Sequence, residues 1–406
     1  MAKVLEKFPV RYDVHKYLGR KPWYAVRDII SQYTRPADTV MDLFSGSGVA
    51  AFEAMALGRN AIAVDCSPLS ELIARSLCEG YDAGKYMEAA TSMLSRLTPY
   101  QGLYQVEFQG RKGILKYWQP KLNRGKIFFP EDGSAYTGDL TGAKQVGVRD
   151  GLYSFRWSHA ETLIPAIKGN NVSRWGEMFT ERGECVLSHA LSSAGRMGNP
   201  ALKRCLFVAI SASIEKISLL NRFKSGGGGW LREKPLCYYK SDDFIEFNAV
   251  DAIESKMLKM GAALAETNGL LKKNANFTFL REKVEDIRYS GKADLIIMDP
   301  PYLDEVLYDK LEALHDIWLG LSPSEQEIRL SFNMEAKKAC DALKRNGTLV
   351  LLMQNYLPES KNFLVNGLLD AGLAKTKEVQ NPGRKKEGMT MVMFQKGGSH
   401  NPYLKA

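Results

Sequence analysis

Short apolar runs, glycine turns and amphipathic stretches alternate near the N-terminus of this chain. Residues 40–43 are mostly apolar and predict a short buried strand, and the alanine-rich stretch 49–57 has good helix formers. Gly58 ends this helix, and residues 61–64 form a second apolar run. A strand, a helix and another strand in this order indicate the βαβ beginning of a parallel sheet.

The C-terminal part of the chain shows the same alternation. An apolar stripe at helical spacing runs from Val306 to Leu319 and predicts a helix that packs on a core. Strand character recurs at residues 277–280, 293–299, 348–353, 374–379 and 389–395. Together with the N-terminal segment, these runs predict an α/β fold.

The alternation breaks down between the two parts, over a length too great for a loop inside one compact domain. We therefore predict that residues 81–275 form an inserted domain, with residues 1–80 and 276–406 as the two halves of a second domain. The insertion has a mixed α/β pattern. Its strand-like and helical stretches are residues 102–118, 125–136 and 185–220.

Composition narrows the class of protein. With 406 residues, of which 45% are hydrophobic, the chain can bury a large core. It has no apolar run long enough to span a membrane and no signal peptide, so we expect a soluble, cytoplasmic protein. The six cysteines are scattered without metal-ligand spacing, so we expect reduced thiols and no bound metal. A net charge of +9 favours an anionic partner, with nucleic acid as a candidate.

Two polar motifs stand where predicted strands end. Gly46 and Gly48 permit a tight turn after the first strand, and Asp65 follows the second. The apolar run 295–298 ends abruptly in Asp-Pro-Pro-Tyr, residues 299–302. Because ligands of an open parallel sheet bind beyond the carboxyl ends of its strands, we expect the turn and the tetrad to face one cleft.

The stretch DLFSGSG at residues 42–48, followed by DPPY at residues 299–302, resembles DNA amino-methyltransferases, particularly the adenine-specific ones. The resemblance covers residues 11–80 and 277–397. It implies a Rossmann-like methyltransferase sheet and S-adenosylmethionine as the cofactor. The residues that it implies at the cofactor are Lys21, Asp42, Phe44, Ser45, Gly46, Gly48, Asp65 and Cys66. Among them, Asp65 could bind the ribose hydroxyls, and Lys21 or its neighbour Arg20 could pair with the carboxylate.

The resemblance also implies a role for the tetrad. The exocyclic amine of adenine is a poor nucleophile because its lone pair is delocalised into the ring. In the family, the aspartate, here Asp299, accepts one amine hydrogen, and the backbone carbonyl of Pro300 accepts the other. Pro300 and Pro301 fix the backbone, and Tyr302 can stack on a base extruded from the duplex. Aspartate in the first position favours adenine over cytosine, for which serine is more usual.

The order of the motifs resembles that in the DNA amino-methyltransferases whose target-recognition domain lies between the cofactor half and the catalytic half. This resemblance implies double-stranded DNA as the partner. Residues 196–240 contain nine lysines or arginines against two acids, with aromatic residues interspersed. Basic side chains can neutralise phosphates, and aromatic rings can stack on bases. The candidate DNA contacts are Arg222, Lys224, Trp230 and Arg232.

Each assignment has an alternative. The tetrad is also a common kind of turn, Asp65 could cap a helix, and the basic segment could be a solvated helical face. As functions, a cytosine-N4 methyltransferase, an RNA amino-methyltransferase and a catalytically silent DNA-binding module stay open. The contacts to the cofactor adenine, the oligomeric state and the presence of a cognate restriction endonuclease are also open.

Overall fold

The structure, a computed structural model, divides the chain into two compact units. The described residues are 9–17, 19–146, 157–223, 230–232, 234, 236–300, 308–321, 332–354, 358–380 and 389–397. The first unit takes Met1–Lys16, Tyr81–Ala265 and Lys310–Leu321. The second unit takes Tyr17–Gly80, Glu266–Asp309 and Ser322–Ala406. The three-part division expected from the sequence therefore stays a proposal.

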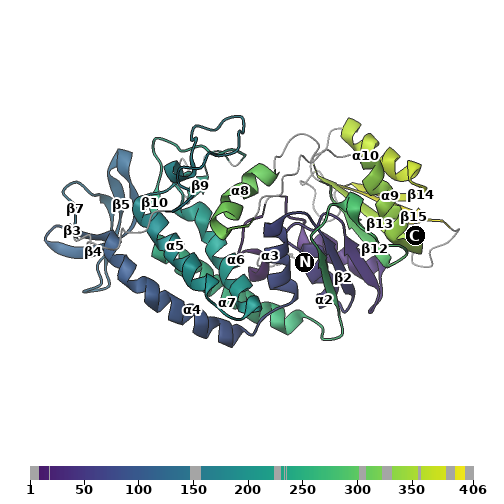
Figure 1. The fold of residues 1–406 in the computed structure, drawn as a ribbon, viewed down its shortest axis with the longest axis horizontal. Helices are drawn as coiled ribbons and strands as arrows, with labels where there is room; N and C mark the ends of the chain where they lie inside the picture. Colours follow the sequence, from purple (N-terminus) through teal and green to yellow (C-terminus); the bar gives the residue numbers. More distant parts are fainter. Residues whose placement is uncertain are drawn as a thin grey trace, which may run out of the picture. The chain divides into compact units, whose positions relative to one another are not determined.

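A seven-stranded sheet forms the second unit, with strand order β11-β2-β1-β12-β13-β15-β14 (Figure 1). Strand β15 pairs antiparallel with β13 and β14, and the other described pairings are parallel. The strands are β1 (Thr39–Asp42), β2 (Asn60–Val64), β11 (Phe277–Leu280), β12 (Ala293–Met298), β13 (Leu343–Gln354), β14 (Leu373–Gln380) and β15 (Met389–Lys396). This is a Rossmann-like α/β sheet, as the sequence predicts.

Helices pack against this sheet, and α2 among them is buried on all sides. The helix α3 shows how the sequence sets a boundary, because the Ser67 hydroxyl accepts a hydrogen bond from Ser70 N and Pro68 occupies the first helical position. Strand β12 runs through the centre, and its residues Leu295, Ile296 and Ile297 are fully buried. The helices are α1 (Trp23–Tyr33), α2 (Val49–Ala56), α3 (Pro68–Cys78), α9 (Phe332–Ala342) and α10 (Pro358–Asp370).

The predicted strands of the second unit are confirmed, and the largest difference lies in β13. This strand begins at Leu343, ahead of the apolar run expected at residues 348–353. Its first part is polar and irregular, with Asn346 at φ 65° and a register shift opposite Ala293 to Leu295. A bulge of this kind breaks the period of two on which the prediction rested.

The first unit joins a second sheet to a group of helices (Figure 1). The sheet order is β6-β5-β4-β3-β7, and β10 pairs with β4. The strands are β3 (Gln105–Phe108), β4 (Arg111–Gln119), β5 (Arg124–Phe128), β6 (Ala135–Asp139), β7 (Lys144–Gln145) and β10 (Glu246–Phe247), beside the hairpin β8 (Asn221–Phe223) and β9 (Trp230–Arg232). The helices are α4 (Ala83–Leu97), α5 (Glu181–Gly195), α6 (Pro200–Ile217), α7 (Ala249–Leu270) and α8 (Tyr308–Leu319), and the last residues of α7 belong to the second unit.

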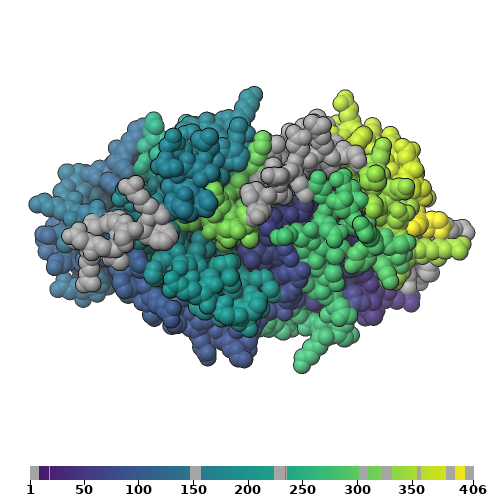
Figure 2. Space-filling view, in the orientation of Figure 1, coloured from purple at the N-terminus to yellow at the C-terminus, as the bar shows by residue number. Residues whose placement is uncertain are grey.

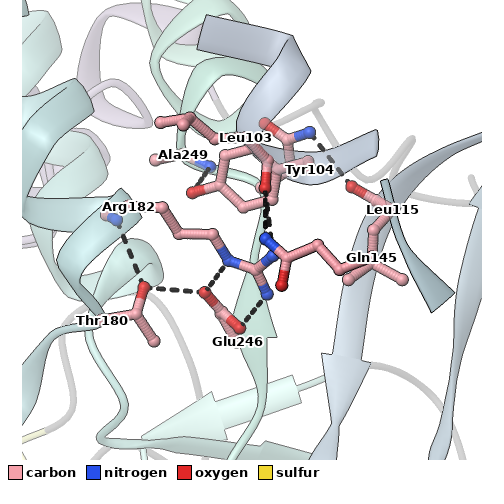
Figure 3. A network of polar contacts seen from close by, with 10 residues as sticks. Leu103, Tyr104, Leu115, Gln145, Thr180, Arg182, Glu246 and Ala249 are labelled. Atoms are coloured by element: carbon pink, nitrogen blue, oxygen red, sulfur yellow. Dashed lines mark hydrogen bonds and ion pairs between the residues drawn. The ribbon is translucent and has the colours of Figure 1, made fainter. Parts of the chain in front are cut away.

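A buried ion pair ties this sheet to the helices (Figure 3). Arg182 of α5 donates from Nε to Glu246 Oε1 at 2.6 Å and from Nη2 to Glu246 Oε2. The third contact of the guanidinium is the carbonyl of Leu103, and its charge lies 4.7 Å from the centroid of the Tyr104 ring. Thr180 Oγ1 also donates to Glu246. Such a bidentate pair satisfies both charges inside the protein.

The predicted helix after the tetrad is confirmed as α8, and it packs in the first unit. Tyr238 Oη donates to the Lys310 carbonyl at 2.7 Å, and the rings of Trp157 and Trp318 stack 3.8 Å apart. Figure 2 shows the green surface of α8 beside the teal surface of the insertion. None of the described helices combines the length and apolar composition that a membrane crossing requires.

The buried carboxyl of Glu335 in α9 makes stability depend on pH. Burial, with a smaller effect of Glu285, raises the pKa of Glu335 to about 7 from an ordinary value of 4.5. Between these two pH values the unfolded chain releases a proton that the folded protein keeps, so folding loses stability as the pH rises. We expect Glu335→Gln to remove this loss and to raise the unfolding free energy by about 1–3 kcal/mol more at pH 8 than at pH 5.

Urea unfolding at both pH values measures this difference, and the exposed Glu282→Gln is the control. An equal effect of Glu335→Gln at pH 5 and pH 8 would contradict a protonated carboxyl at this position.

Candidate active site

The glycine turn after β1 is held by backbone hydrogen bonds. Ser45 N donates to the Val64 carbonyl of β2, and Gly48 N donates to the Ser45 carbonyl, both at 3.0 Å. Gly46 and Gly48 have φ values of 51° and 79°, which residues with a Cβ rarely adopt. A Cβ added to Gly48 would lie 2.7 Å from the Cβ of Ala74 in α3. The turn therefore requires glycine for two reasons, backbone conformation and close approach.

Asp65 at the end of β2 fixes the turn from the other side. Its Oδ2 accepts a hydrogen bond from Gly46 N at 2.7 Å, and its Oδ1 accepts one from Ser67 N at 2.9 Å. Burial raises the pKa of Asp65, and these two backbone N–H groups oppose that rise. The helix cap of α3 is Ser67 itself. Asp65 thus holds the glycine turn, and a contact with a cofactor ribose stays a proposal.

The tetrad begins on the strand next to the turn. Strands β1 and β12 pair in parallel, with Asp42 opposite Ile297, so both strands end at the same edge of the sheet. Asp299 follows β12 directly and is partly exposed. Its pKa is raised to about 6 by the loss of water around it, while the charge of Lys21 lowers it and that of Asp42 raises it. The pKa of Asp299 therefore depends on the charges of Lys21 and Asp42.

Lys21 supplies the positive charge of this site. Its Nζ lies 3.3 Å from Asp42 Oδ2 and donates to the Phe44 carbonyl at 2.5 Å. Lys21 is 6% exposed and Asp42 1% exposed. Burial raises the pKa of Asp42, and the lysine charge and a hydrogen bond from Phe44 N oppose this. The resemblance implied that Lys21 or Arg20 pairs with the cofactor carboxylate, and the structure gives Lys21 partners within the protein.

Two serine hydroxyls in the turn provide an independent sign of a ligand. Ser45 Oγ and Ser47 Oγ are buried and have no hydrogen-bond partner among the described residues. Buried polar groups are rarely left without a partner in proteins, so such a pair fits a site for a polar molecule. The turn, with its small residues and the N-terminus of α2, suits a charged and hydroxylated cofactor.

The structure describes most of the predicted site residues. Pro300 is buried next to Asp299, and Cys66 is partly exposed next to Asp65. Pro301 and Tyr302 lie outside the described residues. Sequence reasoning missed Ser47 and also Tyr17, whose ring would lie 2.9 Å from a Cβ on Gly46. A serine between two glycines could have been noticed, whereas no sequence signal indicates the contact with Tyr17.

The predicted DNA contacts fall on the hairpin of β8 and β9. In this hairpin Arg222 pairs with Leu231, and Phe223 pairs with Trp230. Arg222 is partly exposed and donates to the Phe223 carbonyl at 3.1 Å. Only the backbone of Trp230 and Arg232 is described, and Lys224 lies outside the described residues. The role of this hairpin therefore stays a prediction.

Part of the chain matches a family of known proteins. Residues 5–74, which include Lys21, the glycine turn and Asp65, match the family model of N6/N4 DNA methylases. A curated relative, the type II methyltransferase M.MjaII of Methanocaldococcus jannaschii, is 29% identical over 85 residues. These matches support a DNA methyltransferase. The aligned segment is 21% of this chain and 16% of the relative, so the chain matches a small part of that protein.

The DNA-methylase match also supports S-adenosylmethionine as the cofactor, as the sequence predicts. Solved methyltransferase structures show only distant likeness. A SAM-dependent methyltransferase from Methanosarcina mazei is 9% identical with a TM-score of 0.30, covering 91% of this chain and 96% of its own. The N-methyltransferase NodS from Bradyrhizobium japonicum is 14% identical with a TM-score of 0.22, covering 35% and 69%. At these TM-scores the likeness supports no conclusion, and the assignment of the fold rests on the order of the strands in the sheet.

We expect Gly48→Ala to abolish cofactor binding or to weaken it by about tenfold or more, because the new Cβ displaces the turn against Ala74. Gly58→Ala is a matched control, since Gly58 has φ 78° but its added Cβ would meet only Lys272 Cγ at 3.9 Å. Both variants carry similar backbone strain. Calorimetric titration with S-adenosylmethionine separates them, and equal affinities would show that the close approach at Gly48 does not shape the site.

Proposed function

We infer that the protein transfers a methyl group from S-adenosylmethionine to the exocyclic N6 amine of an adenine in double-stranded DNA. The observation that carries this proposal is the position of Asp299. The carboxyl of Asp299 follows β12 at the sheet edge where the glycine turn follows the adjacent β1. A cofactor in the turn and an amine at Asp299 would therefore be neighbours at one edge of the sheet.

S-adenosylmethionine supplies an electrophilic methyl group on a positively charged sulfur, which is already a good leaving group. The protein has to align the amine and to adjust its lone pair. An ionised Asp299 accepts a hydrogen bond from one amine hydrogen, and the Pro300 carbonyl accepts one from the other. Both interactions draw the lone pair out of the ring and strengthen as positive charge develops on the nitrogen, so they lower the barrier. The proline ring of Pro300 restricts the backbone that presents this carbonyl.

Two features favour adenine in DNA within the methylase family. The first residue of the tetrad is an aspartate, which the resemblance associates with adenine, whereas serine would indicate cytosine N4. The long insertion between the two motifs is the pattern of methyltransferases that recognise a DNA sequence, and its basic segment supports an acidic partner. Methylated cytosine as the product, or RNA as the better substrate, would replace this proposal.

Asp299→Ala should lower single-turnover methyl transfer by about a thousandfold while leaving S-adenosylmethionine affinity unchanged, because the lost hydrogen bond acts mainly in the transition state. Sequencing genomic DNA for modified bases after expression identifies the methylated site. A duplex containing that site is then the substrate for the rate measurement. A folded Asp299→Ala protein with a near-parental rate would exclude the mechanism.

The pH profile gives a second test, because only the ionised carboxylate of Asp299 stabilises the positive charge that develops on the amine nitrogen. With a pKa of about 6, kcat/KM should fall about tenfold per pH unit below pH 6. Lys21→Met removes the charge that lowers the pKa of Asp299, so the fall should begin at higher pH.

Arg27→Met is the matched control for this shift. It also removes a cation from a buried carboxylate in the same unit, since Arg27 Nη1 lies 2.7 Å from the fully buried Glu53. In Arg27→Met, kcat/KM should therefore begin to fall at the same pH as in the parent. If the fall begins at the parental pH in Lys21→Met as well, Asp299 is not the group that titrates.

A further inference from the structure

The solvent side of the six-stranded sheet in the first unit carries an excess of positive charge. Successive residues of a strand point to opposite faces, and Val106, Leu115 and Ile127 are buried on one of them. The other face carries Lys112 of β4 and Lys126 of β5. We call this the basic face, and its charged residues are Lys112, Arg124, Lys126 and Lys144.

Few acids oppose these charges. Glu107 pairs across the strands with Lys112 and Lys144, and Asp139 pairs with Arg124. Hydrogen bonds from Thr141, with a smaller effect of Arg124, lower the pKa of Asp139. The cross-strand neighbours of Lys126 are Tyr117 and Thr137. The ion pairs described for strands β3 to β7 and their turns are Arg111–Asp132, Lys116–Asp251 and Lys121–Asp242, and none of these pairs includes a charged residue of the basic face.

Aromatic rings lie between the charges. Tyr117 and Phe128 are partly exposed on the basic face. Lys116 Nζ lies 5.4 Å from the centroid of the Phe128 ring, and Asp251 at 2.8 Å neutralises its charge. The Tyr117 ring contacts Phe223 of β8 edge to face, with centroids 5.2 Å apart. The basic face is therefore continuous with the hairpin whose arginines the sequence singled out. Rings of this kind can pack against sugars and bases between phosphate contacts.

The spacing of the charges suits a long polyanion. From Lys112 to the level of Arg124, the face extends over about seven residues of β4, or roughly 20 Å of strand. Duplex DNA carries one phosphate charge per about 1.7 Å of axis, so about twelve phosphates span that distance. The side chains project from a sheet that the buried pair of Arg182 and Glu246 anchors to α5 (Figure 3). Fixed strands hold charges at constant spacing, which favours a regular partner.

We propose that the basic face of this sheet is a docking surface for the phosphate backbone of double-stranded DNA. The choice of DNA rests on the proposed function, whereas the position of the surface rests on the sheet itself. This surface lies outside the segment of residues 196–240 that the sequence analysis favoured. It covers β5, β4 and β3, and Tyr117 at its border contacts Phe223 of β8.

The test replaces Lys112, Arg124 and Lys126 with glutamine in the full-length protein. The affinity for a fluorescent duplex should fall at least about tenfold near 0.1 M salt, and the slope of log affinity against log salt should lose about two to three units. The matched control neutralises three exposed lysines of the second unit, Lys337, Lys375 and Lys377. It changes the net charge equally and should leave both quantities close to parental.

Equal effects of the two triple variants would overturn the proposal, because they would reflect total charge and not this face. Tighter parental binding to single-stranded RNA than to a duplex of equal length would overturn DNA as the partner. S-adenosylmethionine affinity and the thermal midpoint should not change in either variant. If the parent binds DNA through this face but methylates no DNA, the proposed function fails and the docking surface stands. If methylation occurs and the basic-face variant binds normally, only the docking surface fails.

Discussion

A single buried lysine holds the negative charges of the candidate site together. Lys21 arrives from the segment before α1 and contacts both the Asp42 carboxylate and the Phe44 carbonyl. Burial of an unpaired carboxylate costs several kcal/mol, so Asp42 at the end of a central strand depends on this cation. The same charge lowers the pKa of Asp299. Chain segments far apart in the sequence thus share one electrostatic centre, which the parallel pairing of β1 and β12 brings to one edge.

This arrangement explains why two short motifs predicted that the glycine turn and the tetrad follow strands ending at one edge of the sheet. Each motif includes its own strand, so the apolar runs before Asp42 and Asp299 indicated both the sheet and the edge at which the motifs meet. Strand β11 coincides with the expected residues 277–280, and β12 ends one residue before the expected limit at Asp299. Local patterns were sufficient here because central parallel strands are apolar throughout.

Other features depend on contacts that no local pattern contains. The approach of Tyr17 to Gly46, and of Ala74 to Gly48, appears only when distant segments come together. Asp65 was expected to contact a ribose, and its carboxylate also accepts N–H groups of the turn and of Ser67, because the loop geometry places them there. In the insertion, the long helix α7 was not anticipated, and the pairing of β10 with β4 joins residues more than a hundred positions apart. Two residues in β10 are too few to show a period.

The Arg182–Glu246 pair and the charges at the glycine turn differ in how completely their polar atoms are satisfied. In the first unit, Arg182 and Glu246 use their donors and acceptors on each other, on Thr180 and on the Leu103 carbonyl, so their role is to fix the sheet on the helices. At the glycine turn, Asp42 Oδ2 has an ion pair but no hydrogen bond, and Ser45 Oγ and Ser47 Oγ have no partner in the described structure. Leaving a buried polar group without a partner costs about 1–3 kcal/mol each, unless another molecule supplies the missing partner. The unsatisfied group therefore fits the proposed cofactor site, at the sheet edge where Asp299 follows the neighbouring strand.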